Sequence, residues 1–170
     1  MPTPHEGGCF CDGIRYAVSA EPLTLYACHC TDCQRQTGSS FALSMILPRD
    51  ALSLLRGDPR HAIRTMPDGR RLHSRFCGEC GSHMWGEPPK FPQVVVLRPG
   101  TLDDTSWLRP VGHIWTRSAQ PWESIPEGTL SFDGQPPDPM ALIEEWRRVR
   151  GASPEVSADG MTGVGRRGPD

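Results

Sequence analysis

The chain has 170 residues, a length typical of one domain, and its 18 Gly and 18 Pro favour turns and short strands over long helices. Its formal net charge of -2 argues against nucleic acid or an anionic membrane surface as a partner. The start, MPTPHEGGCFC, has no basic or apolar signal region, and no stretch approaches the roughly 18 unbroken apolar residues of a spanning helix, so we expect a cytoplasmic protein.

Short segments with strand-like patterns make the predicted fold mainly β. Apolar residues alternate with polar ones or run together in these segments: 13–19, 23–28, 41–47, the two arms of 64–76, 93–100 and 111–116. A turn-like Ala-Glu-Pro between 13–19 and 23–28 predicts that the two form an antiparallel pair. Pro67-Asp68-Gly69 predicts the turn of a hairpin over 64–76.

Both ends of the chain are predicted to be loose, with a helix before the second end. Residues 1–6 are expected to form a flexible lead-in, and the small, polar, Gly/Pro-rich residues 151–170 a disordered tail. Residues 137–150 have a proline-opened start, an acidic middle and a basic finish, which predicts an amphipathic C-terminal helix. The residues predicted for its apolar face are Met140, Ile143, Trp146 and Val149. We therefore expect one domain of small antiparallel sheets and a C-terminal helix over 7–150.

The seven cysteines are the most informative residues, because an odd number is poorly explained by disulfides. They fall into three groups: Cys9-x-Cys11, Cys28-x-Cys30-x-x-Cys33 and Cys77-x-x-Cys80. Zinc binds thiolates at ~2.3 Å in a tetrahedron, and these spacings allow such geometry. Seven divides naturally into a closed structural site built from the two pairs and a three-cysteine site whose fourth position is exchangeable, which predicts two zinc ions per chain.

Other assignments of the three-cysteine site remain open at this stage. A histidine would close it as a second structural zinc site, and the candidates are His29, His83 and His113. His29 is a poor candidate, because a residue between two ligands of an extended segment points away from them. The spacing matches neither ferredoxin pattern, which argues against an iron–sulfur cluster, and the Cys-x-Cys partners argue for metal over redox-active pairs.

Four motifs occur in a fixed order along the chain: GGCFCDGIRY, CHCTDCQRQTGSSFA, FCGECGS and PGTLDDTSWLRPVGHIWTRSAQPW. Over about residues 7–123 this order resembles the glutathione-dependent formaldehyde-activating enzyme family, which also includes centromere protein V. The resemblance implies a mainly β fold with a structural zinc on Cys9, Cys11, Cys77 and Cys80 and a catalytic zinc on Cys28, Cys30 and Cys33. The basic extension of the centromere relative is absent here, which argues against a chromatin role.

The resemblance also implies an activity. Zinc on three thiolates carries a net charge of -1, which suits the binding of a substrate thiol better than the activation of water. The family reaction joins glutathione and formaldehyde into S-hydroxymethylglutathione, so we expect a carbon-sulfur lyase acting on a thiol adduct of formaldehyde or a related small electrophile. Two rivals remain: a non-catalytic glutathione carrier and a zinc-stabilised interaction module. The oligomeric state is left open.

Glutathione brings two carboxylates, so arginines and backbone amides are expected near the site. Arg35 with the amides of Gly38 and Ser39 is the first candidate, against the alternative of a solvated arginine on a short helix. On the strand over 111–116, His113 is predicted as a proton shuttle and Trp115 as a pocket wall, with Arg117 continuing the same face. Ordinary core packing is the alternative for Trp115. Arg98 and Arg109 are further candidate cations.

Overall fold

Two β-sheets form the body of the chain in the computed structural model, which describes residues 4–65, 69 and 71–151. The smaller sheet contains, in spatial order, β1 (His5–Gly8), β2 (Arg15–Val18) and β5 (Leu52–Arg56). The larger sheet contains, in spatial order, β11 (Leu130–Phe132), β10 (Gly112–Ile114), β3 (Thr24–Cys28), β4 (Ala42–Pro48), β9 (Val94–Leu97), β8 (His83–Gly86), β7 (Arg71–Phe76) and β6 (Arg60–Thr65). The mainly β class is confirmed.

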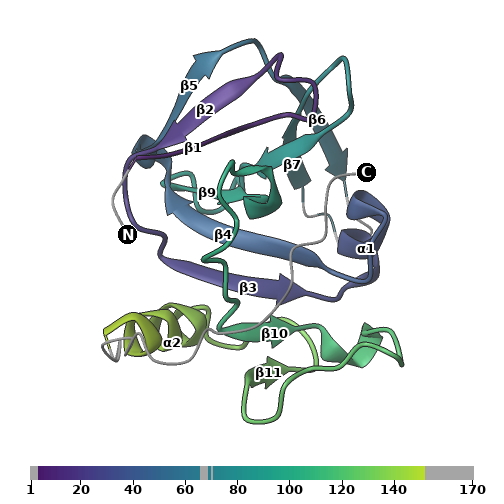
Figure 1. Cartoon of the computed structure of the whole chain (residues 1–170). Helices are drawn as coiled ribbons and strands as arrows, with labels where there is room; N and C mark the ends of the chain where they lie inside the picture. The colour runs from purple at the N-terminus through teal and green to yellow at the C-terminus, as the bar shows by residue number, and fades with distance from the viewer. Residues whose placement is uncertain (1–3, 66–68, 70, 152–170) are drawn as a thin grey trace, which may run out of the picture.

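Helices take up a small part of the described chain. They are α1 (Thr31–Thr37), α2 (Met140–Gly151) and the 3-10 turns η1 (Arg49–Ala51), η2 (Pro99–Thr101) and η3 (Thr116–Ser118). Figure 1 shows α1 between the end of β3 and the start of β4, and α2 beside β3 and β10 on the side away from the smaller sheet. No described helix has the length and apolar character needed to cross a membrane.

The core lies between the two sheets, where alternate residues of their strands meet. Its fully buried side chains include Tyr16, Leu25, Met45, Leu47, Met84 and Leu97. The rings of Tyr16 from β2 and Trp85 from β8 meet edge to face, with their centroids 6.1 Å apart, so the two sheets are in direct contact. Alternation places these residues inward, which is why β3, β4 and β9 were visible in the sequence.

The predicted pairing of 13–19 with 23–28 is wrong. β2 pairs with β1 and β5, whereas β3 pairs antiparallel with β4 and parallel with β10. Residues 20–22 therefore carry the chain from one sheet to the other and do not close a hairpin. The partner that β2 takes, β1, begins at His5 inside the predicted lead-in, and its Gly7 and Gly8 leave no apolar pattern to detect.

The other predicted hairpin is present. β6 and β7 pair antiparallel, from Arg60 opposite Phe76 to Thr65 opposite Arg71, which confirms the hairpin arms. Pro67 and Asp68 of the predicted turn lie outside the described residues, as do residues 152–170 of the predicted tail.

The C-terminal helix is confirmed, but its buried face differs from the prediction. Leu142 and Trp146 are buried, whereas Met140 and Val149 are each 42% exposed. The helix contacts β3, where Thr24 Oγ1 donates to the Leu142 carbonyl over 2.8 Å. Spacing alone does not show which side of a helix meets the sheet.

Candidate functional site

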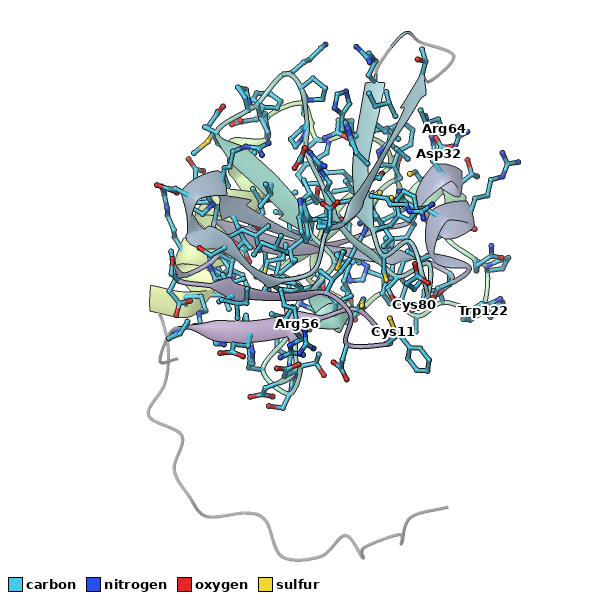
Figure 2. The ribbon with its side chains drawn as sticks, turned by 90° about the horizontal axis from the view of Figure 1, so that it is seen from above. Cys11, Asp32, Arg56, Arg64, Cys80 and Trp122 are labelled. Atoms are coloured by element: carbon cyan, nitrogen blue, oxygen red, sulfur yellow. The ribbon has the colours of Figure 1, made fainter. Side chains whose placement is uncertain are left out.

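Four cysteines from the two sheets meet in one group, called here the four-cysteine group: Cys9, Cys11, Cys77 and Cys80. Their sulfurs all lie within 4.8 Å of one another. The Cys9–Cys11 and Cys11–Cys77 sulfur distances are 3.5 and 3.7 Å, close to the ~3.8 Å edge of a zinc–thiolate tetrahedron. Figure 2 shows Cys11 and Cys80 next to each other. This donor set fits a closed metal site.

Each cysteine pair of this group sits in a tight turn that directs both sulfurs to the same side. Gly81 has φ 75° and donates its N–H to the Cys77 carbonyl over 3.0 Å, a conformation that glycine adopts without strain. In the first pair Asp12 takes the equivalent left-handed role at φ 57°, and the Ile14 N–H donates to Cys9 Sγ over 3.2 Å. Backbone N–H groups pointing at a sulfur favour its thiolate form.

The other three cysteines form the three-cysteine group, Cys28, Cys30 and Cys33, whose sulfurs also lie within 4.8 Å of one another. Cys28 is the last residue of β3, and Cys30 is the N-cap of α1. The Cys30 sulfur accepts from the Cys33 N–H at 3.4 Å, as a serine oxygen does at an ordinary helix start. The Cys-x-x-Cys spacing therefore follows from the geometry of a helix N-terminus.

Three sulfurs this close together suit a cation. The neighbouring Cys30 and Cys33 sulfurs, and then burial, raise the pKa of Cys28, while the hydrogen bonds from Cys28 and Cys33 lower the pKa of Cys30. One thiolate is thus favoured at the expense of the next, and a divalent metal ion would reduce this competition by offsetting two of the three negative charges.

No histidine, carboxylate or fourth cysteine of the described chain joins the three-cysteine group. His29 is fully buried and directs Nε2 at His113 Nδ1, 2.8 Å away. His83 accepts on Nδ1 from Arg98 Nε at 3.3 Å. None of the three candidate histidines therefore closes this site.

Burial favours the neutral form of the two buried histidines. It lowers the pKa of His29, and burial followed by repulsion from a protonated His29 lowers the pKa of His113. Their rings stack with centroids 5.1 Å apart, and His29 Nδ1 has no partner among the described residues. His113 lies next to Ala27 in the register of β10 on β3, so this pair packs directly behind the strand end that carries Cys28.

The predicted common strand face of His113, Trp115 and Arg117 is wrong. Strand β10 ends at Ile114, and Trp115 takes φ 60°, a rare conformation for a bulky residue, before η3 begins. Trp115 nevertheless packs against the buried cluster of Cys28, Ile114 and Leu142, against which Cys30 and Cys33 also pack. The Arg117 guanidinium lies 4.7 Å from the Trp115 ring centroid. Trp115 thus shares this cluster with the three cysteines, although it lies beyond the end of the strand.

The first predicted anion contacts lie at the far end of α1. Arg35, Gly38 and Ser39 are all exposed. The Gly38 N–H donates to the Gln34 carbonyl over 2.8 Å, so the helix C-cap already uses one of the two predicted amide donors.

Three polar residues near the three-cysteine group were not predicted or were ranked low. Tyr26 lies two residues before Cys28, on the same side of β3, and burial followed by the charge of Cys28 raises its pKa to about 12. Gln34 donates through Nε2 to the carbonyls of His29 and Ser118, each over 2.7 Å, and so ties α1 to η3. Arg98 bonds to α1, β4 and β8. Alternation would have revealed Tyr26, whereas Gln34 and Arg98 depend on contacts between distant segments.

The hairpin of β6 and β7 contacts α1. Arg64 Nη2 lies 3.1 Å from Asp32 Oδ1, and Figure 2 shows these two side chains facing each other. Gln36 Nε2 donates to Ser74 Oγ over 3.2 Å. The helix that carries Cys33 is therefore held by two separate segments, this hairpin and η3.

The fold and its two cysteine groups define a β protein with two candidate thiolate metal sites. The family model described as "Glutathione-dependent formaldehyde-activating enzyme" matches residues 4–118, which include all seven cysteines. The chain belongs to the glutathione-dependent formaldehyde-activating enzyme family, as the sequence motifs indicated.

Two similar proteins are named for the same family. A Halomonas elongata protein named "Putative glutathione-dependent formaldehyde-activating enzyme" is 25% identical over 148 residues, which are 83% of this chain and 92% of that protein. A Talaromyces marneffei protein of the same name is 25% identical over 162 residues, 84% of each chain. A crystal structure of a Rhodobacter sphaeroides protein has a TM-score of 0.48 and 18% identity, and covers 75% of this chain and 98% of that one.

Proposed function

We propose that the chain is a zinc-dependent carbon-sulfur lyase that makes or breaks the bond between a thiol, glutathione in the first instance, and formaldehyde or a related small electrophile. Cys28, Cys30 and Cys33 would hold the catalytic zinc, and the four-cysteine group would hold a structural zinc. The observation that supports this most is a compact group of three sulfurs with no fourth donor from the described chain. Three protein ligands and one open position are the pattern of a catalytic zinc site.

Zinc bound by three thiolates would accept the sulfur of an incoming thiol and favour its deprotonated, nucleophilic form. The residues around the group would orient the substrate. Trp115 would form an apolar wall, because it packs against the same buried cluster as Cys30 and Cys33. Arg117, which is stacked on the Trp115 ring, and Arg35 with Ser39 at the end of α1 are proposed contacts for the carboxylates of glutathione.

Adduct formation moves one proton from the thiol to the oxygen of the carbonyl, and cleavage returns it. We assign this transfer to His113, which is neutral and therefore able to accept a proton. Its Nδ1 lies 2.8 Å from Nε2 of His29, so a proton on either ring can be shared across the pair. Only 7% of His113 is exposed, which limits exchange of that proton with bulk water.

The test is exchange spectroscopy of formaldehyde and glutathione with the zinc-loaded protein. We expect the rate of interconversion with S-hydroxymethylglutathione to rise above the rate in buffer, and the acceleration to disappear in Cys30→Ser. Binding of glutathione without acceleration would identify a carrier and contradict the lyase. An unchanged metal environment on addition of glutathione would identify an interaction module.

A further inference from the structure

Arg98 differs from the other partly buried arginines near the core because no carboxylate of the described chain pairs with it. Arg15 pairs with Asp103, and Arg75 lies 3.1 Å from Glu87. Arg98 is also half-buried, yet every acceptor that the described chain offers it is neutral. A partly desolvated guanidinium without a counter-charge is unfavourable, so such a group is usually found where an anion binds.

The guanidinium is held rigidly by three separate elements. Its neutral acceptors are Gln36 Oε1 on α1 at 2.7 Å, Ser44 Oγ on β4 at 2.8 Å, the Leu43 carbonyl at 3.3 Å and His83 Nδ1 on β8 at 3.3 Å. These acceptors use four of the five N–H groups of the arginine side chain. The fifth N–H, on Nη2, has no acceptor among the described residues. An arginine fixed in this way loses little side-chain entropy when it binds a ligand.

Arg98 also lies next to the three-cysteine group. Arg98 Nη1 donates to Ser44 Oγ over 2.8 Å, and Ser44 pairs with Tyr26 in the register of β3 and β4, two residues before Cys28. The bond to Gln36 attaches it to the same helix, one turn beyond Cys33. Arg35 is exposed on α1, and Arg117 is stacked on Trp115.

We propose that Arg98 is the specificity-determining residue of the thiol site and that it binds a carboxylate of the thiol substrate. The inference rests on the proposed function, because it takes the three-cysteine group as the place where the sulfur binds. It changes the ranking of the proposed carboxylate contacts. Arg98, which is fixed in the sheet at the end of β9, selects an acidic thiol, and Arg35 and Arg117 contribute less to this selection. Neutral thiols of the same length bind more weakly.

The experiment compares thiols that differ only in charge. Zinc-loaded protein is titrated calorimetrically with mercaptoacetate and 3-mercaptopropionate, and with the amides of both acids. For the better-fitting length we expect the wild-type protein to bind the acid about tenfold more tightly than the amide, the order of one charge-assisted hydrogen bond. Arg98→Gln should reduce the ratio to near one, and comparing ratios cancels the difference in thiol acidity between acid and amide.

Two variants serve as references. Arg98→Lys keeps the charge without the planar fork and should retain part of the preference. Arg49→Gln removes an arginine just beyond the opposite end of β4, where it donates to the Pro92 carbonyl over 2.6 Å, and should leave the ratio unchanged. Zinc content and circular dichroism are measured for every variant. If Arg98→Gln does not fold, two other measurements test the role of Arg98: the acid-to-amide affinity ratio of Arg98→Lys, and the salt dependence of this ratio in the wild-type protein. An ion pair weakens with added salt, so the wild-type ratio should fall.

The outcomes separate the inference from the function on which it rests. Binding of acid and amide with equal affinity by the wild-type protein, or an acid preference that survives in Arg98→Gln, overturns the role of Arg98 and leaves thiol binding intact. Loss of one zinc ion from Arg98→Gln also overturns it, because Arg98 would then only balance the thiolate charge. Failure of every thiol to bind overturns the proposed function together with the inference.

Discussion

Cys30 combines two roles in one atom. Its sulfur caps α1 by accepting the Cys33 N–H at 3.4 Å, and the same sulfur belongs to the three-cysteine group. The N–H bond directs the sulfur and favours its thiolate form, which is what a metal ligand requires. A serine at this position would keep a capping oxygen, whereas an alanine would provide neither cap nor ligand.

This difference gives a prediction for two variants. Cys30→Ser should reduce the zinc content from two ions per chain to one and leave the protein folded, because the four-cysteine group and the helix cap are both retained. Cys30→Ala should lose the same zinc ion and a further ~1 kcal/mol of unfolding free energy, the usual contribution of an N-cap. Elemental analysis and denaturant unfolding measure the two quantities. Loss of both zinc ions from Cys30→Ser would show that the two groups are not independent.

Elements with strong local patterns were predictable, and those set by distant contacts were not. β3, β4 and β9 bury alternate or consecutive apolar residues, and the cysteine groups follow from spacings fixed by tight turns and by a helix start. β1 has two glycines, and β10 stops at Ile114 because Trp115 adopts a positive φ that its residue type does not indicate. The role of Arg98 could not be predicted, because its hydrogen bonds require α1, β4 and β8 to meet. That meeting depends on the strand order of the whole sheet.

The buried face of α2, which contains Leu142 and not Met140, can be tested by substitution. Leu142 is 4% exposed and so close to β10 that a Cβ on Gly112 would lie 2.7 Å from its Cδ2, whereas Met140 is 42% exposed. Leu142→Ala should lower the unfolding free energy by about 2–4 kcal/mol, because it leaves a cavity against the sheet. Met140→Ala should change it by less than about 0.5 kcal/mol. Equal effects in denaturant unfolding would support the face predicted from spacing.

At the scale of the whole molecule, the four-cysteine group joins the two sheets. Cys9 and Cys11 follow β1, and Cys77 and Cys80 lie between β7 and β8, so one metal ion would close a loop of 66 residues from Cys11 to Cys77. The sheets are also held by the Tyr16–Trp85 contact and by the 2.6 Å hydrogen bond between Tyr16 and Thr101. The metal site therefore adds to the existing interface between the two sheets. Its contribution matters because the strands of the smaller sheet are short.

Removal of a ligand from this group should therefore affect stability much more than removal of one from the three-cysteine group, where all ligands come from 28–33. We expect Cys77→Ser to lose the structural zinc and several kcal/mol, which lowers the melting temperature by roughly 10 °C or more at about 2–4 °C per kcal/mol. Ser82→Ala keeps all four sulfurs while removing the hydroxyl 3.2 Å from Cys80, and should melt near the wild type. Scanning calorimetry with and without a zinc chelator measures the shift. If Cys30→Ser lowered the melting temperature as far as Cys77→Ser, the division into a structural and a catalytic site would be wrong.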